Sequence, residues 1–146
     1  MSNPAPDPEA QRDVRRLERV NPPRLSPPTG FSHAVVAEGT RIVQLAGQTA
    51  LDGEGRVVGD TLPEQFARAL EHLLTALQAA GGAPEDLTRA TVYTVDLPAY
   101  RAHARELGRT WHRLVGRNYP AMAVLGVAAL WDAAALVEID GVAVLP

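Results

Sequence analysis

The chain has 146 residues and lacks both cysteine and lysine, and these absences remove several kinds of chemistry. Without cysteine there can be no disulfide, no thiolate metal ligand and no cysteine nucleophile. All 14 basic residues are arginine, so a mechanism through a lysine Schiff base is excluded.

Long apolar runs and targeting signals are also missing. No apolar stretch reaches the roughly 18 residues of a membrane-spanning helix. The N-terminal segment MSNPAPDPEA does not place an apolar region after basic residues, so no secretory signal is predicted and a cytoplasmic location is favoured. A net charge of −3 argues against a dedicated nucleic-acid-binding protein.

Metal and nucleotide motifs are absent as well. No two histidines stand four apart on a predicted helix, and none belongs to an H-E-x-x-H pattern; they are His33, His72, His103 and His112. There is no P-loop, no G-x-G-x-x-G fingerprint and no G-x-S-x-G elbow. We therefore predict no metal site and no cofactor.

What remains is typical of one globular domain, with 46% hydrophobic and 21% charged residues. Residues 1–20 begin with Pro4, Pro6 and Pro8, and we predict a flexible extension, in part helical from Glu9 to Arg19. Residues 21–146 should form a single domain.

Hydrophobic periodicity and turn residues predict strands and helices in alternation. Two helices are predicted, at residues 62–80 after the N-cap Thr61 and from Asp96 to Gly116. The Glu38-Gly39-Thr40 turn should join the first two strands in a hairpin. The predicted strands cover residues 34–38, 41–48, 56–58, 88–95, 122–130 and 136–145.

This order predicts an α+β fold, a single mixed β-sheet with two helices packed on one face. The last two strands are apolar on both faces, whereas a sheet with one covered face should alternate apolar and polar residues. Because no helix is left for the second face, we expect copies of the chain to cover it in an oligomer.

Glu138 lies in the most apolar part of the chain, between Val137 and Ile139. Residues two apart in a strand share a face, so Glu138 should share one face with Leu136 and Asp140. Burying an unpaired carboxylate is costly, so this one must be paired, hydrated or used in chemistry.

The chain resembles the reactive-intermediate deaminase (Rid, or YjgF) family from about Val20 to Leu145. The resemblance rests on motifs in matching order: Gly30-Phe31-Ser32-His33-Ala34, Ala46-Gly47-Gln48, Ala79-Ala80-Gly81-Gly82, Thr91-Val92-Tyr93-Thr94-Val95-Asp96, Tyr119-Pro120-Ala121 and Val137-Glu138-Ile139. It implies a chorismate-mutase-like fold and a trimer whose sheets face inward, with small-molecule sites between subunits.

The resemblance also assigns residue roles. The glutamate that matches Glu138 orients or activates water for imine hydrolysis, which makes Glu138 the candidate catalytic residue. Pocket residues carried over are Phe31, Ala46, Gly47, Tyr119, Pro120 and Met122. Structural alternatives stay open, since Glu138 could hold strand register, Gly47 could serve a bulge or tight strand packing, and Tyr119 and Pro120 could simply begin a strand.

Three positions depart from the deaminating members, and all make the pocket less polar. Met122 stands where those members carry an arginine that clamps the substrate carboxylate, Phe31 where tyrosine is frequent, and Ala46 where serine is common. A neutral or aromatic ligand is therefore expected. Arg24 and Arg117 are candidates for a replacement cation.

An arginine stripe, defined as Arg101, Arg105, Arg109 and Arg113, recurs every four residues along the second predicted helix. It could contact phosphates, as in family members described as endoribonucleases or translation inhibitors, or could be a solvated surface eased by Glu106. Three functions therefore stay open: an imine or enamine hydrolase, a non-catalytic ligand-binding protein and an RNA-acting protein.

Overall fold

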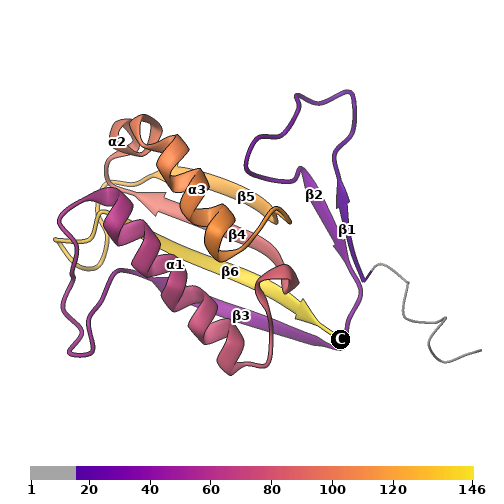
Figure 1. The fold of residues 1–146 in the computed structure, drawn as a ribbon, viewed down its shortest axis with the longest axis horizontal. Coiled ribbons are helices and arrows are strands. Elements are labelled where there is room, and N and C mark those ends of the chain that lie inside the picture. The colour runs from indigo at the N-terminus through magenta and orange to yellow at the C-terminus, as the bar shows by residue number, and fades with distance from the viewer. Residues whose placement is uncertain (1–15) are drawn as a thin grey trace, which may run out of the picture.

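The computed structural model describes residues 16–146, so the predictions for residues 1–15 lie outside the described residues. The helix predicted from Glu9 to Arg19 is wrong at its C-terminal end, because Leu17–Val20 form strand β1. This strand pairs antiparallel with β2 (Ala34–Ala37). The two make a ribbon that stands beside the main sheet (Figure 1).

The predicted hairpin around Gly39 is also wrong. β2 takes its hydrogen-bond partner from β1, and the chain runs on from β2 into β3 (Arg41–Gln48) without turning back. Thr40 donates its backbone N–H to the carbonyl of Leu145 at 3.0 Å. A side chain on Gly39 would collide with that carbonyl, so glycine is needed for this close passage.

The main sheet has four strands in the order β3-β6-β4-β5. β4 (Leu87–Thr94) pairs in parallel with β5 (Ala121–Gly126), and β6 (Val137–Leu145) lies antiparallel to both β3 and β4. The mixed sheet and the α+β class are confirmed, although the chain forms this sheet and a separate ribbon. β5 stops at Gly126, short of the predicted end at Leu130, and the predicted strand at 56–58 is reduced to a bridge between Leu51 and Val57.

Helix α1 (Leu62–Ala79) follows the prediction closely. Thr61 and Glu64 form a reciprocal capping box, with each side chain accepting a hydrogen bond from the other residue's backbone N–H at 3.3 Å. Its apolar stripe is buried against the sheet, with Phe66, Leu70, Leu73 and Leu77 at 2% exposure or less. These residues form the centre of the core.

The second predicted helix is broken in two. Asp96 caps α2 (Leu97–Ala102) by accepting a hydrogen bond from the Ala99 N–H, and α3 (Ala104–Leu114) begins after His103. No proline or glycine marks this break in the sequence. A short 3-10 helix, Pro84–Asp86, links α1 to β4. No helix among the described residues is both long and apolar enough to cross a membrane.

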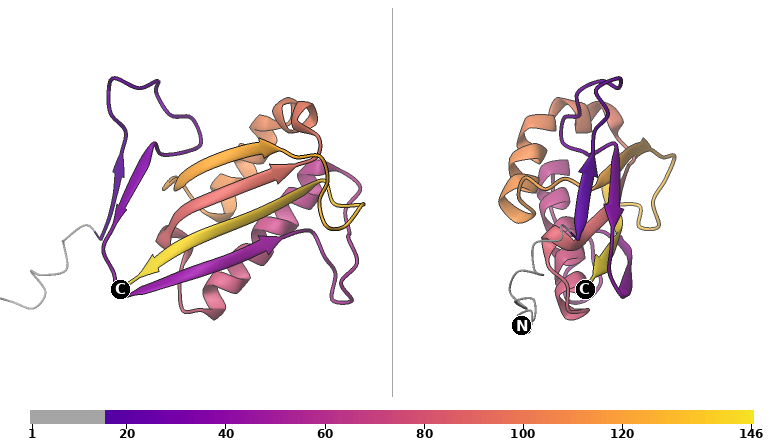
Figure 2. Two further views of the ribbon diagram at one scale, coloured as in Figure 1. Left: turned by 180° about the vertical axis from the view of Figure 1, so that it is seen from behind. Right: turned by 90° about the vertical axis from the view of Figure 1, so that its right-hand side faces the viewer.

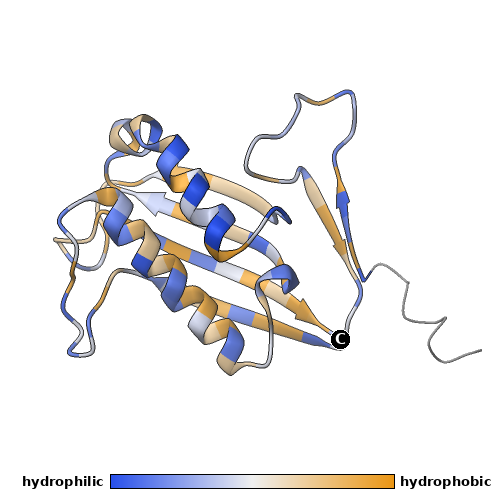
Figure 3. Cartoon of the chain, viewed as in Figure 1, coloured by the Kyte–Doolittle hydropathy of each residue, from blue (hydrophilic) through white to orange (hydrophobic). Residues whose placement is uncertain are grey.

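The helices lie on one face of the four-stranded sheet (Figure 2). Apolar residues run along the strands behind them, and polar residues lie on the outer turns of α3 (Figure 3). β6 alternates as predicted, with Val137, Ile139 and Ala143 fully buried on the helix face. On the other face, which we call the open face, Ile42 is 68% exposed, and no described element covers it.

Candidate functional site

The predicted site residues fall into two groups on opposite faces of the sheet. Met122 aligns with the buried Ala90 in the parallel β4–β5 pair, so its side chain is on the helix face. Glu138 alternates with the buried Val137 and Ile139, so it points to the open face. One chain therefore does not bring Met122 and Glu138 into the same pocket.

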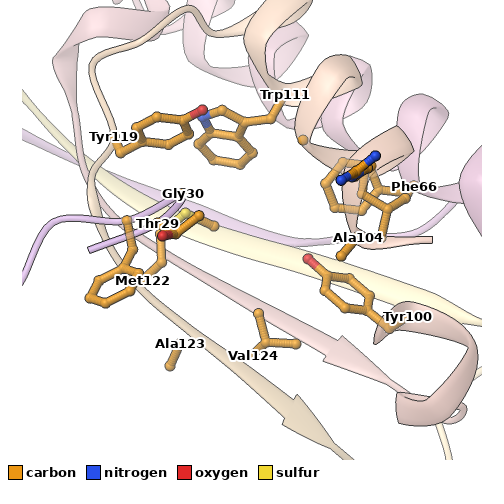
Figure 4. Close-up of a pocket in the computed structure, with 14 residues that line it drawn as sticks. Thr29, Gly30, Phe66, Tyr100, Ala104, Trp111, Tyr119, Met122, Ala123 and Val124 are labelled. Atoms are coloured by element: carbon orange, nitrogen blue, oxygen red, sulfur yellow. The ribbon is translucent and has the colours of Figure 1, made fainter. Parts of the chain in front are cut away.

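The first group lines a cavity of about 630 Å³ between α3 and the beginning of β5. Phe31, Tyr119 and Met122 all line it, as predicted for pocket residues. Pro120 is fully buried close by and accepts a hydrogen bond from the Ser32 N–H at 2.9 Å. Figure 4 shows Tyr119 and Met122 on one side of this space and Tyr100 on the other.

The segment around Phe31 is held against β5 by Ser32. Its hydroxyl donates to the carbonyl of Tyr119 at 2.7 Å, and Ser32 also bridges Ala121 in parallel. Gly30 precedes it with φ of 74°, a left-handed conformation that glycine adopts without strain. This anchoring fixes Phe31 at the cavity, with its ring edge-on to His33 at 5.0 Å.

The remaining wall consists of aromatic rings from the three helices and from the segment that leads into β5. Trp111 of α3 stacks on Tyr119 with ring centroids 6.3 Å apart, and Phe66 of α1 meets Tyr100 of α2 edge-on at 6.2 Å. Burial raises the pKa of Tyr100 to about 12, so its hydroxyl stays protonated at neutral pH. The Trp111 Nε1–H is buried and has no hydrogen-bond partner within the described residues.

The cation at the cavity is Arg105, and neither candidate from the sequence lines it. Arg24 lies exposed in the proline-rich loop, and Arg117 donates its Nε–H to His112 Nε2 at 2.7 Å. Arg105 is exposed on α3 and forms no salt bridge with any residue of the described part of the chain. It therefore remains available to an anionic ligand.

The second group surrounds Glu138 on the open face. A side chain on Gly47 would collide with Glu138 Oε1, so the carboxylate lies directly over the backbone of β3. Ala46 and Gly47 fall where the β3–β6 register shifts between Leu45 and Gln48. The bulge and the tight packing that were left open for Gly47 are both present, and the missing side chain of Gly47 leaves room for Glu138.

Glu138 has polar neighbours on the open face. Tyr93, its partner on β4, donates its hydroxyl to Asp140 Oδ2 at 3.0 Å. That hydrogen bond raises the pKa of Tyr93, since removing its proton would leave two negative groups in contact. Asp140 is therefore engaged by Tyr93, whereas no hydrogen bond or salt bridge is found for the Glu138 carboxylate within residues 16–146.

Comparison with known proteins gives the family. The model of the family described as endoribonuclease L-PSP matches residues 22–145. The RutC family protein UK114 of Drosophila melanogaster is 31% identical over 118 residues, which cover 80% of each chain. This chain belongs to the Rid/YjgF family.

Solved structures of Rid proteins agree with the fold. The Rid-family protein YyfB of Yersinia pestis is 33% identical and superposes with a TM-score of 0.80, covering 89% of this chain and 99% of the other. Rv2704 of Mycobacterium tuberculosis, a member of the YjgF/YER057c/UK114 family, is 30% identical with a TM-score of 0.60, covering 80% of this chain and 87% of the other.

The arginine stripe of this Rid protein is solvent-exposed, with Arg101 on α2 and the others on α3. None of its arginines forms a salt bridge within residues 16–146, and Glu106 approaches His103 Nδ1 at 3.5 Å. The expected easing by Glu106 is therefore not seen as an ion pair. No cluster of three or more potential metal-ligating residues occurs among residues 16–146.

The apolar residues of the predicted helix from Asp96 to Gly116 predict one buried stripe, made of Tyr100, Ala104, Leu107, Trp111 and Leu114. The sequence did not show that three members of this apolar stripe, Tyr100, Ala104 and Trp111, line a cavity. Leu107 and Trp111 are indeed buried, but Ala104 is exposed at the cavity. The break at His103 separates Tyr100 from the rest of the stripe, and nothing in the sequence marks that break. The one feature of the sequence that could have indicated a cavity here was Gly108, a glycine beside the large residues of the apolar stripe.

Proposed function

We propose that this Rid-family chain is a hydrolase of the imine deaminase type that works as a homotrimer with its open sheet faces turned inward. Each site would take its cavity from one subunit and its carboxylate from the neighbouring subunit. The residues Phe31, Tyr119 and Met122 would then contact the ligand from one side, and Gly47 and Glu138 from the other.

The location of these groups on opposite sheet faces carries the proposal. The open face bears exposed apolar side chains, among them Ile42 and Leu125, that water contacts unfavourably. A second copy would bury them, and if its edge strand β5, beside which its cavity lies, met this face, it would bring that cavity to Glu138. The same contact would exclude water from the carboxylate, where acid–base chemistry gains strength.

The chemistry is hydrolysis of a C=N bond. In the proposed step Glu138 accepts a proton from water while the water oxygen bonds to the carbon of the protonated imine. The nitrogen of the tetrahedral adduct then takes the proton from Glu138, and the carbon–nitrogen bond breaks. Ammonia leaves while the hydroxyl of the adduct gives its proton to the Glu138 carboxylate and becomes the carbonyl. The protonated imine and water are consumed, and a carbonyl compound, ammonia and one proton, which Glu138 releases to water, are produced.

The test is ammonia release from imines that an amino-acid oxidase generates in the same vessel. Wild type should accelerate release, and Glu138→Gln should abolish the acceleration, because general acid–base groups contribute about 10²–10⁴-fold. Asp140→Asn is the matched control, since it neutralises the next carboxylate on the same strand and face. Equal rates for wild type and Glu138→Gln would reject the deaminase function. A ligand that binds to the protein but is not hydrolysed would indicate a non-catalytic binding protein instead.

The unpaired arginine stripe favours RNA binding as a second candidate. Four exposed guanidinium groups at helical spacing can contact phosphates, although their region lacks interleaved exposed aromatic residues. RNA binding that weakens in an Arg109→Ala/Arg113→Ala variant, and weakens with added salt, would support this function. Unchanged binding in that variant would remove the stripe from consideration.

A further inference from the structure

We infer that the cavity beside α3 binds a carboxylate that carries an aromatic group, with Arg105 as the anchor of the carboxylate. This names a substrate class for the proposed function and rests on that function for the chemistry, while the binding itself can be tested without turnover. The inference follows from the cavity's walls and from the charge at its edge.

The walls favour an aromatic group. Phe31, Phe66, Tyr100, Trp111 and Tyr119 all line the cavity, and Met122 and Val124 complete its apolar surface. A volume of about 630 Å³ is within the usual range for small-molecule sites. Aromatic rings offer both faces and edges to a bound ring, which packs against them in stacked or edge-on geometry.

The charge at the edge favours an anion. Among the lining residues that belong to the described part of the chain, Arg105 is the one that is charged, and Met122, which faces the same space, cannot donate a hydrogen bond. Arg109 stands one turn further along α3, so a second exposed guanidinium group lies near this edge. A guanidinium group can bind a carboxylate through two parallel hydrogen bonds, which fixes the orientation of the ligand as well as its charge.

Trp111 adds ring surface to the wall and no hydrogen bond. Its Nε1 is buried and has no partner in the described part of the chain, so a ligand in the cavity does not reach this donor.

The test measures binding by titration calorimetry, with phenylacetate as the probe and two comparison compounds. Phenylacetamide keeps the ring and removes the charge, and acetate keeps the charge and removes the ring. Phenylacetate should bind most tightly. Arg105→Gln should weaken it about tenfold or more and leave phenylacetamide unchanged, because only the carboxylate uses the guanidinium group. Arg109→Gln, the control from the next turn, should change binding less than about twofold.

Gly108 tests whether the ligand lies in the cavity or on the surface. It lines the cavity, has an ordinary helical conformation, and no atom lies within 4 Å of an added Cβ. Gly108→Phe should therefore fill the space and abolish binding of both aromatic probes. Gly108→Ala is the matched control, since it leaves most of the volume free and removes the helix-weakening glycine.

Several results would overturn the inference: no detectable phenylacetate binding, equal affinity for phenylacetate and phenylacetamide, or wild-type affinity in Arg105→Gln or Gly108→Phe. Its failure is distinguishable from failure of the proposed function. If imine hydrolysis depends on Glu138 but phenylacetate binds equally well to wild type and Arg105→Gln, the proposed hydrolase is supported and the role of Arg105 as anchor is rejected. If binding depends on Arg105 and no imine is hydrolysed, the aromatic carboxylate site stands without the deaminase.

Discussion

At the scale of single residues, the Glu138 carboxylate has room because the residue beside it on strand β3, Gly47, has no side chain. Gly47 leaves the space that the carboxylate occupies, and any larger residue there would meet Oε1. Asp140, two residues further along β6, is instead held by the hydroxyl of Tyr93. Two carboxylates on one face of one strand thus have different surroundings, and only Glu138 has no protein partner among residues 16–146.

Gly47→Ala should therefore displace the Glu138 carboxylate without removing it. If Glu138 is catalytic, activity should fall by about a hundredfold, because small misplacements of a reacting group have effects of that size. Gly53→Ala is the control, since an added Cβ at Gly53 meets no atom within 4 Å. Imine hydrolysis by Gly47→Ala at the wild-type rate, with the fold intact by circular dichroism, would show that the position of Glu138 does not matter.

These residue-level features were only partly predictable. The alternation of β6 placed Glu138 and Asp140 on one face correctly, because strand periodicity alone decides it. Arg105 was assigned to a stripe but not to a cavity. Which arginine reaches the cavity depends on how α3 packs beside β5, and that packing follows from long-range contacts that no local pattern encodes.

At the scale of elements, α1 and β6 were predictable because local and long-range preferences agree in them. The Thr61–Glu64 capping box fixes where α1 begins, and its leucines have one face to bury. The N-terminal ribbon was not predictable, since the charged and apolar residues of Leu17–Val20 suit a helix as well as a strand. Pairing with β2, a tertiary contact, decided the outcome.

Helix α2 has only six residues and owes its position to tertiary contacts. Tyr100 packs edge-on against Phe66 of α1, and burial raises its pKa from 10.0 to about 12. The raised folded-state pKa makes the protonated form the one that packs. Stability from this residue is therefore complete below pH 10.0 and is lost as the pH rises toward about 12.

We expect the free energy of unfolding of wild type to fall over that alkaline range, and to fall less in Tyr100→Phe, which has no proton to lose there. Urea denaturation at several alkaline pH values measures both. Parallel pH dependence in the two proteins would mean that the hydroxyl of Tyr100 is not buried in solution.

At the scale of the whole molecule, one face of the main sheet has no described element over it, and the proposed oligomer would cover this face. The helices all lie on one side, and the open face carries Ile42 and Leu125 at 68% and 43% exposure. The sequence already indicated this, because β6 has apolar residues on both faces and a sheet with one covered face needs them on only one. The sequence could not show that Met122 and Glu138 lie on opposite faces, since that depends on the register of β4 with both β5 and β6.

The absence of cysteine allows a direct test of the shared site. Met122→Cys and Glu138→Cys chains, each with its own affinity tag, are co-expressed, purified through both tags and treated with a short bismaleimide. A site shared between neighbouring copies predicts a covalent dimer that carries both tags. It predicts no covalent dimer when either variant is treated alone. A sample that sediments as a monomer, or one that gives no doubly tagged dimer, would contradict the shared site.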